Sequence, residues 1–193
     1  MHKIHSTEGL VLAKRGVGEA NVRIVLLTEG LGLINASARS SRFEHSKLRY
    51  GLEPLTRARF ALVRGKAEWR LTGVEQISRD CIGGGSARRQ ASGRIARLLL
   101  RLVQGEEPLV ELYRAVREGL LFLAAATSEQ DAQAVECVLV LRVLAQLGYL
   151  PHTQELAPFI ADTFFSVELA AEAAKSRTLL IRTINESLQS TGL

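Results

Sequence analysis

A basic run between residues 38 and 54 is the part of the chain best suited to chemistry, and that chemistry is the binding of phosphate. Arg39, Arg42, Lys47 and Arg49 lie close together, and Glu44 is the only acid between Arg39 and Arg49. Arginine donates two parallel hydrogen bonds from a planar fork that matches phosphate oxygens. We therefore interpret the run as a loop that holds a nucleic-acid backbone. The alternative is a set of ordinary solvated surface charges.

Positive charge is concentrated in the first half of the chain. Residues 1–101 hold 19 Lys and Arg against 8 Asp and Glu, an excess of 11 positive charges, whereas residues 102–193 hold 6 against 12. A surface with such an excess attracts polyanions through its long-range field. The distribution makes nucleic acid the leading candidate partner.

Alternating apolar and polar residues predict five β-strands in the first 80 residues. In the fourth, Ala58, Phe60 and Leu62 face one way, while Arg57 and Arg59 face the other. Five strands with a longer connection after the third are typical of the oligonucleotide-binding (OB) barrel. The strands are expected at residues 8–14, 22–28, 33–39, 55–64 and 69–77, with a loop at residues 15–20.

Further side chains belong to the same predicted surface. Lys14 and Arg15 flank the first loop, and the loops of an OB barrel border its binding face. Trp69 could stack on a base, but it shares its phase with Leu71, which favours a place in the barrel core. The candidate DNA-binding residues of the barrel are Lys14, Arg15, Arg39, Arg42, Lys47 and Arg49.

Three consecutive glycines, residues 83–85, mark a domain boundary. They lack the Gly-Lys-Ser/Thr ending of a phosphate loop, so we interpret them as a hinge. The expected domains are an OB-fold nucleic-acid-binding domain at residues 1–80 and a helical domain at residues 86–193. The fold class is therefore α+β, a five-stranded barrel followed by an all-α bundle.

Beyond the glycines the apolar period becomes helical, at about 3.6 residues. One helix is expected from Ser86 and a second from Pro108. A third, capped by Asp131 and ending at Gly148, is apolar on nearly all sides, which predicts that it forms the buried centre of the bundle. Two amphipathic helices are expected near residues 166–175 and 177–188.

Three arginines of the first predicted helix, Arg94, Arg97 and Arg101, lie on one ridge, because spacings of three and four return to the same side. The ridge could extend the DNA-binding surface beyond the barrel. It could equally pair with acids of the helical domain, such as Glu106 or Glu111. Both interpretations stay open at this point.

No arrangement of residues suggests catalysis, a cofactor or a metal site. The four histidines are scattered, and Cys81 and Cys137 lie far apart without ligand spacing, so we expect two reduced thiols. No apolar run reaches the roughly 18 residues of a membrane-spanning helix, and the amino terminus has no apolar signal core. We therefore expect a cytoplasmic, nucleoid-associated protein that is not an enzyme.

Several short motifs resemble the bacterial recombination mediator family RecO. The family's first strand and first loop resemble Glu8-Gly9-Leu10-Val11-Leu12 and Gly18-Glu19. Where the family has Ala-Lys-Gly-Ala-Arg and Ala-Leu-Glu-Pro, this chain has Ala38-Arg39-Ser40-Ser41-Arg42 and Gly51-Leu52-Glu53-Pro54. The end of the family's central helix resembles Leu147-Gly148-Tyr149.

The resemblance implies an OB fold followed by a helical domain. It also implies binding to single- and double-stranded DNA, strand annealing, and cooperation with RecR in loading RecA onto DNA coated by single-strand-binding protein (SSB). The family's four-cysteine zinc site has no counterpart after Tyr149, so no zinc is implied. The family's Arg and Phe-Glu in the central helix are replaced by Cys137-Val138-Leu139-Val140, so the residues that dock the SSB tail are not carried over. The chain resembles a reduced or divergent member.

Two other interpretations remain. The chain could be an OB-fold RNA-binding protein, in which case contacts to 2′-hydroxyl groups would give a preference for RNA. It could also be a protein-interaction module without a nucleic-acid role, whose apolar bundle binds a partner and whose basic face is incidental.

Overall fold

The computed structural model describes residues 3–39, 41, 46, 48–151 and 153–190, and the chain divides into two units. The first unit comprises Met1–Cys81 together with Val103–Tyr113, and the second comprises Ile82–Leu102 and Arg114–Leu193. The sequence pattern predicted one continuous helical domain at residues 86–193. The structure instead groups Val103–Tyr113 with the barrel, because this segment bonds to it: the Leu33 amide donates to the Gly105 carbonyl at 3.1 Å.

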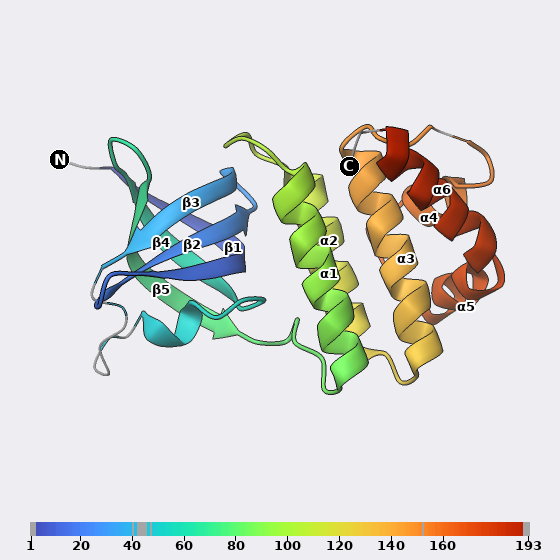
Figure 1. Ribbon diagram of the computed structural model, residues 1–193, viewed down its shortest axis with the longest axis horizontal. Helices are drawn as coiled ribbons and strands as arrows, with labels where there is room; N and C mark the ends of the chain where they lie inside the picture. Colours follow the sequence, from blue (N-terminus) through green and yellow to red (C-terminus); the bar gives the residue numbers. More distant parts are fainter. Residues whose placement is uncertain (1–2, 40, 42–45, 47, 152, 191–193) are drawn as a thin grey trace. The chain divides into compact units, whose positions relative to one another are not determined.

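The first unit is built on a closed five-stranded barrel (Figure 1). Its strands are β1 (Ile4–Val17), β2 (Asn21–Thr28), β3 (Gly32–Ala38), β4 (Arg57–Arg64) and β5 (Trp69–Ser78), and a short 3-10 helix, η1 (Arg49–Gly51), lies between β3 and β4. The order around the barrel is β1-β2-β3-β5-β4, with only the β3–β5 pair parallel among the described strands. The OB-type barrel predicted from the strand pattern is confirmed.

The predicted alternation along the strands is also confirmed. Phe60, Leu62 and Trp69 are at most 5% exposed and share one core with apolar residues of the other strands. Three strand boundaries were wrong. β1 begins at Ile4 rather than at residue 8, because Ile4 and the residues after it pair with β4. β1 continues to Val17 rather than ending at residue 14, because Gly16 and Val17 pair with β2, and β4 begins only at Arg57.

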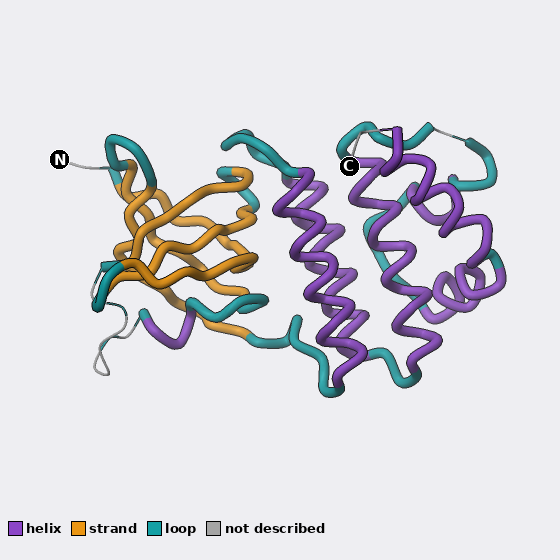
Figure 2. The backbone as a smooth tube through the Cα atoms, in the orientation of Figure 1, coloured by secondary structure: helices purple, strands orange, loops and turns teal. Residues whose placement is uncertain are grey.

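The second unit is helical (Figure 2) and holds α1 (Ser86–Leu102), most of α2 (Val110–Ala125), α3 (Glu129–Gln146), α4 (Ala157–Ile160), α5 (Val167–Lys175) and α6 (Arg177–Ser190). α3 packs against α1, α4, α5 and α6 and is buried along most of its length, which confirms it as the centre of the bundle. Its cap is Ser128 rather than Asp131; Asp131 completes a capping box with it. α2 begins at Val110, two residues beyond the predicted Pro108.

One charged residue lies inside this bundle. Arg142 of α3 is 2% exposed, and its guanidinium donates to the carbonyls of Phe159 at 2.8 Å and Phe164 at 2.9 Å. The same group lies 4.2 Å from the centre of the Phe165 ring. Burial lowers the pKa of Arg142 to about 10, with Asp162 acting in the opposite direction, so the side chain is cationic at neutral pH. Arg142 therefore ties α4 and the loop after it to the central helix.

One of the three glycines predicted as a hinge at the unit boundary is closely packed. The first unit ends at Cys81, and Gly83 is buried in the second, where a Cβ atom would lie 2.9 Å from Arg88 Cβ and 3.1 Å from Ala124 Cα. Gly83 is thus needed for close packing. Among the described residues, no helix combines the length and apolar character required to cross a membrane.

Candidate nucleic-acid interface

A line of arginines crosses the outer face of the barrel. Arg15 of β1 lies opposite Arg23 of β2, Arg23 lies opposite Ser37 of β3, and Ser37 lies opposite Arg70 of β5. Residues paired in this way project from the same face of a sheet, and all three arginines are exposed. We call Arg15, Arg23 and Arg70 the arginine row. With strands about 4.8 Å apart, the row spans about 14 Å.

The arginine row is only partly neutralised. Arg23 Nε donates to Glu68 Oε2 at 2.8 Å, whereas Arg15 and Arg70 have no ion-pair partner among the residues that the structure describes. Like charges placed directly opposite one another on neighbouring strands are destabilising. An anionic ligand would therefore relieve the repulsion between Arg15 and Arg23, and phosphate is the anion that suits the guanidinium fork.

The residues predicted at the first loop have different surroundings. Arg15 belongs to the arginine row, but Lys14 points away from it, because neighbouring strand residues face opposite sides. Lys14 Nζ donates to Glu53 Oε1 at 2.7 Å, so much of its charge is already balanced. Lys14 still lines a shallow groove at the edge of the barrel, together with Gly16, Val22, Ser41, Arg49 and Glu53.

The residues predicted in the basic run are placed only in part. Arg39 directly follows β3, is exposed, and shares the outward phase of Ser37. Arg49 is exposed on η1 and lines the groove just described. Arg42 and Lys47 lie outside the described residues. DNA binding by this run stays a prediction.

Part of the positive charge on the predicted ridge of α1 is balanced by an acid. Arg94 forms two bonds to Glu136 of α3, from Nε at 2.6 Å and from Nη2 at 2.7 Å, and this pairing raises the pKa of Arg94. Arg97 and Arg101 are exposed, with no ion-pair partner within the described part of the chain. Arg94 and Arg97 line a shallow groove with Ser86, Arg89, Gln90 and Gly93. The acid that pairs with the ridge is thus Glu136, which was not among the acids expected from the sequence.

Glu106, one of the acids considered for that ridge, serves the barrel instead. Its carboxylate accepts hydrogen bonds from the Arg64 guanidinium and, at 3.2 Å, from Trp69 Nε1. The bond from Arg64 holds the pKa of Glu106 below its usual value. Trp69 itself is 5% exposed, which confirms its predicted place in the core and removes it as a base-stacking residue.

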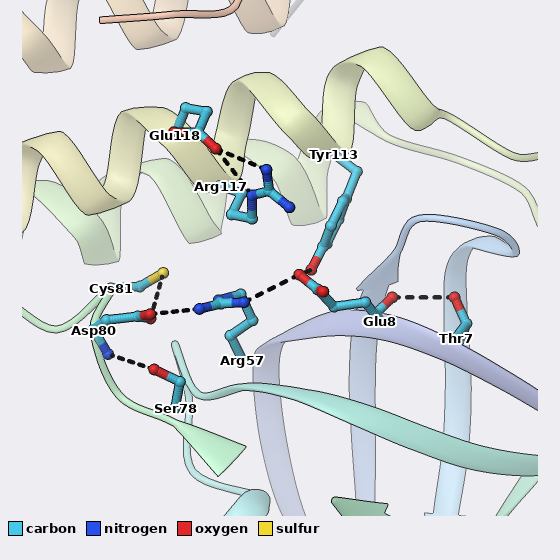
Figure 3. A network of polar contacts seen from close by, with 9 residues as sticks. All are labelled: Thr7, Glu8, Arg57, Ser78, Asp80, Cys81, Tyr113, Arg117 and Glu118. Atoms are coloured by element: carbon cyan, nitrogen blue, oxygen red, sulfur yellow. Dashed lines mark hydrogen bonds and ion pairs between the residues drawn. The ribbon is translucent and has the colours of Figure 1, made fainter. Parts of the chain in front are cut away.

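A polar network fastens the end of β5 and the start of α2 to the barrel (Figure 3). Arg57 donates to Asp80 Oδ2 at 2.5 Å and to Glu8 Oε1 at 3.3 Å, and the Tyr113 hydroxyl donates to Glu8 at 2.9 Å. The hydrogen bond to Asp80 is the main reason that the pKa of Arg57 is raised. Cys81 lies beside Asp80, and burial raises the pKa of its thiol to about 12, so it is unreactive at neutral pH. The role of this network is to stabilise the fold of the barrel unit.

Sequence reasoning missed Arg23, Arg70 and Arg89. The sequence did indicate that Arg70 faces outward, because it lies between Trp69 and Leu71, which were both expected to face inward. Arg23 likewise alternates with the buried Val22 and Ile24. Neither was predicted as a phosphate-binding residue, because within the barrel the sequence interpretation placed such residues only in and beside loops. Both cysteines are free, as expected, and no group of three or more His, Cys, Asp or Glu side chains in the described ranges could hold a metal ion.

Two family models match the chain. The model "Recombination protein O N terminal" matches residues 1–78, which hold the five strands, and "Recombination protein O C terminal" matches residues 91–157. Together they cover most of the sequence. Each falls largely within one part of the architecture described above.

Curated relatives agree with the family models. A protein of Heliobacterium modesticaldum named DNA repair protein RecO is 30% identical over 150 residues, which is 77% of this chain and 53% of the relative. Proteins of the same name from Gloeothece citriformis and Thermodesulfovibrio yellowstonii are 27% and 31% identical, over 80% and 76% of this chain and 55% and 58% of their own lengths. This chain thus spans about half the length of the curated relatives it matches. On these matches and on its barrel-and-helix architecture, the chain belongs to the RecO family.

Proposed function

We propose that this chain is a non-catalytic DNA-binding protein of recombinational DNA repair. It would bind single- and double-stranded DNA through backbone phosphates, assist strand annealing, and help to load a recombinase. Membership of the RecO family and the names of its relatives support the role in repair. By the same family resemblance, a RecR-type protein is its proposed partner. SSB is the second partner that the resemblance implies, although the family's residues that dock the SSB tail are replaced by Cys137-Val138-Leu139-Val140.

The arginine row is the observation that carries DNA binding. It provides guanidinium groups on a rigid sheet, in register across four strands, and Arg15 and Arg70 are not neutralised by acids of the described chain. Contacts of this kind fix the position of a nucleic acid without reading its sequence. The arginine row therefore favours a protein that binds DNA of any sequence, as a repair factor must.

The proposal also includes the residues predicted from the sequence, taken on each unit by itself. On the barrel unit it adds Lys14, Arg39, Arg42, Lys47 and Arg49, of which Lys14 should contribute least because of its bond to Glu53. On the helical unit it adds Arg97 and Arg101, with Arg94 contributing less because of its bonds to Glu136.

The test compares DNA affinity across a set of barrel variants by fluorescence anisotropy at several salt concentrations. The double variant Arg15→Ala with Arg70→Ala should weaken binding to single-stranded DNA and flatten the log–log salt dependence by about 1.4, since each lost phosphate contact removes about 0.7. Glu68→Gln should have the opposite effect, because it releases Arg23 and removes a negative charge beside the row.

Arg59→Ala is the matched control. Arg59 is also an exposed barrel arginine, but on β4, where its register partners are Glu8 and Glu75 rather than cations. Its removal should leave affinity and salt slope unchanged. Binding unaffected by the double variant would exclude the arginine row, and tighter binding of tRNA than of single-stranded DNA would favour the RNA-binding alternative. Arg39→Ala with Arg42→Ala tests the basic run separately, and pull-downs with RecR and SSB test the partners.

A further inference from the structure

The short helix η1 exposes a tyrosine. Tyr50 is 61% exposed, and among the described residues of the first unit it is the only Phe, Tyr or Trp in the exposed class. A tyrosine in a small barrel would ordinarily bury its ring, which is mostly apolar. The position of Tyr50 on the surface leaves a flat aromatic face accessible to a ligand.

The backbone that carries Tyr50 is firmly held. Leu48 packs against the barrel core on one side of η1, and Leu52, on the other side, is fully buried within it. Gly51 fits so tightly against β5 that a Cβ atom there would lie 2.4 Å from Val74 Cγ1. Arg79 Nη2 also donates to the Tyr50 carbonyl at 3.3 Å. Little ordering of the backbone would therefore be needed when a ligand meets the ring.

A bulge in β5 provides apolar surface next to this position. Arg57 pairs with Ser78 while Arg59 pairs with Glu75, so β5 has one extra residue between these pairs, and Gln76 adopts a positive φ of 50°. Bulges of this kind redirect a side chain. Ile77 is 40% exposed, and a Cβ atom at Gly51, the residue after Tyr50, would lie only 3.3 Å from Ile77 Cδ1.

The surroundings of Tyr50 are cationic. Its neighbour Arg49 is exposed and lines the groove that contains Lys14. Arg79 is exposed as well, and its guanidinium donates to a neutral carbonyl, which leaves its charge unbalanced by any acid of the described residues. An aromatic residue with two arginines beside its backbone matches a base next to its phosphates, since stacking and phosphate contacts occur together in proteins that bind single strands.

We propose that Tyr50 stacks on an unpaired base of single-stranded DNA while Arg49 and Arg79 contact the adjoining phosphates. This inference rests on the proposed DNA binding and deepens it. In a duplex the faces of the bases are occupied by their neighbours, so Tyr50 would act only on single strands. It would thereby give the chain a preference that phosphate contacts alone do not provide.

The experiment uses two oligonucleotides of equal length and charge, one of thymidines and one of abasic sites. The full chain should bind the thymidine strand more tightly than the abasic strand. Tyr50→Ala should weaken binding of the thymidine strand by at least about fivefold, the lower end of the range for loss of one stacked base, and should leave binding of the abasic strand and of a duplex unchanged. Tyr50→Phe and Tyr50→Trp should both retain the difference.

Tyr149→Ala is the matched control, because Tyr149 is a second exposed tyrosine, at 36%, in the helical unit. Thermal unfolding of each variant checks that the barrel is intact. If the parent chain binds both strands and Tyr50→Ala changes neither, or both equally, stacking is refuted while phosphate binding stands. If the parent chain binds no DNA, both proposals fall, and the exposed ring would have to be explained as a protein contact.

Discussion

Replacing Arg57 with methionine should lower the free energy of unfolding of the barrel unit by about 2 kcal/mol. Methionine keeps the apolar stem of the side chain but removes the bonds to Asp80 at 2.5 Å and to Glu8 at 3.3 Å. Hydrogen bonds to charged groups are worth about 1.5–3 kcal/mol each. The lower figure applies here, because the side chains of Arg57, Glu8 and Asp80 are 24–35% exposed and solvent screens them.

Two features of the network limit the loss. Glu8 keeps its bond from Tyr113, so it is not left without a donor. Arg57 Nε is buried without a hydrogen-bond partner in the described chain, and removing it recovers part of the energy. The Asp80 bond should therefore dominate. In a double-mutant cycle with Asp80→Asn, the coupling energy should be about 1 kcal/mol.

The chain provides its own probe for the measurement. Trp69 is its single tryptophan and lies in the barrel core, so fluorescence during urea unfolding reports on the first unit, while far-UV circular dichroism mainly reports on the helices. Arg59→Met is the control, since Arg59 is exposed on the same strand and its removal should change stability by less than about 0.5 kcal/mol. A coupling energy near zero, or equal effects at the two arginines, would refute this account of the network.

Three other changes should have equally specific effects. Arg142→Met should destabilise the helical unit by about 3 kcal/mol, seen as a lower urea midpoint in circular dichroism, because it leaves the carbonyls of Phe159, in a buried bond, and Phe164, in a part-buried one, without this donor. Gly32→Ala should cost more than about 2 kcal/mol in the tryptophan-detected transition, because Gly32 has a φ of 67° and a Cβ atom would lie 2.2 Å from the Glu107 carbonyl oxygen. The pKa of Asp80 is lowered: burial opposes ionisation, but hydrogen bonds from Arg57 and Ser78 outweigh it. The ionised Asp80 carboxylate therefore stabilises the fold above about pH 4, and this stabilisation is lost as the pH falls through the folded pKa. In Asp80→Asn the free energy of unfolding should depend less on pH in that range.

The sequence predicted those parts of the fold that depend on local pattern. Alternation placed Phe60 and Leu62 inside and Arg59 outside, and the all-round apolar character of α3 marked it as central. What it did not predict depends on register. Arg15 lies opposite Arg23 only because β1 continues through Gly16. In the sequence alone a glycine at this position indicates a loop, because the strand that pairs with it is not known.

Long-range contacts escaped prediction for a related reason. Nothing local to Gly105 and Glu106 signals that they return to the barrel, since their partners Leu33, Arg64 and Trp69 are 37 to 72 positions away in the chain. Arg142 was missed because a single cation in an apolar helix is ordinarily expected to face solvent. Its partners are backbone carbonyls, which every residue has and which therefore leave no trace in the sequence.

The division of the barrel unit between two separate stretches of chain has a consequence for biosynthesis. The ribosome releases all five strands before it has made Glu106, which accepts the indole hydrogen bond of Trp69, or Tyr113, which caps Glu8. The nascent barrel must wait for the whole of α1 to be translated before these partners arrive. A fragment that ends after the last strand would keep the sheet but lack the contacts of Glu106 and Tyr113. An amino-terminal fragment that is to be stable by itself should therefore extend to residue 113.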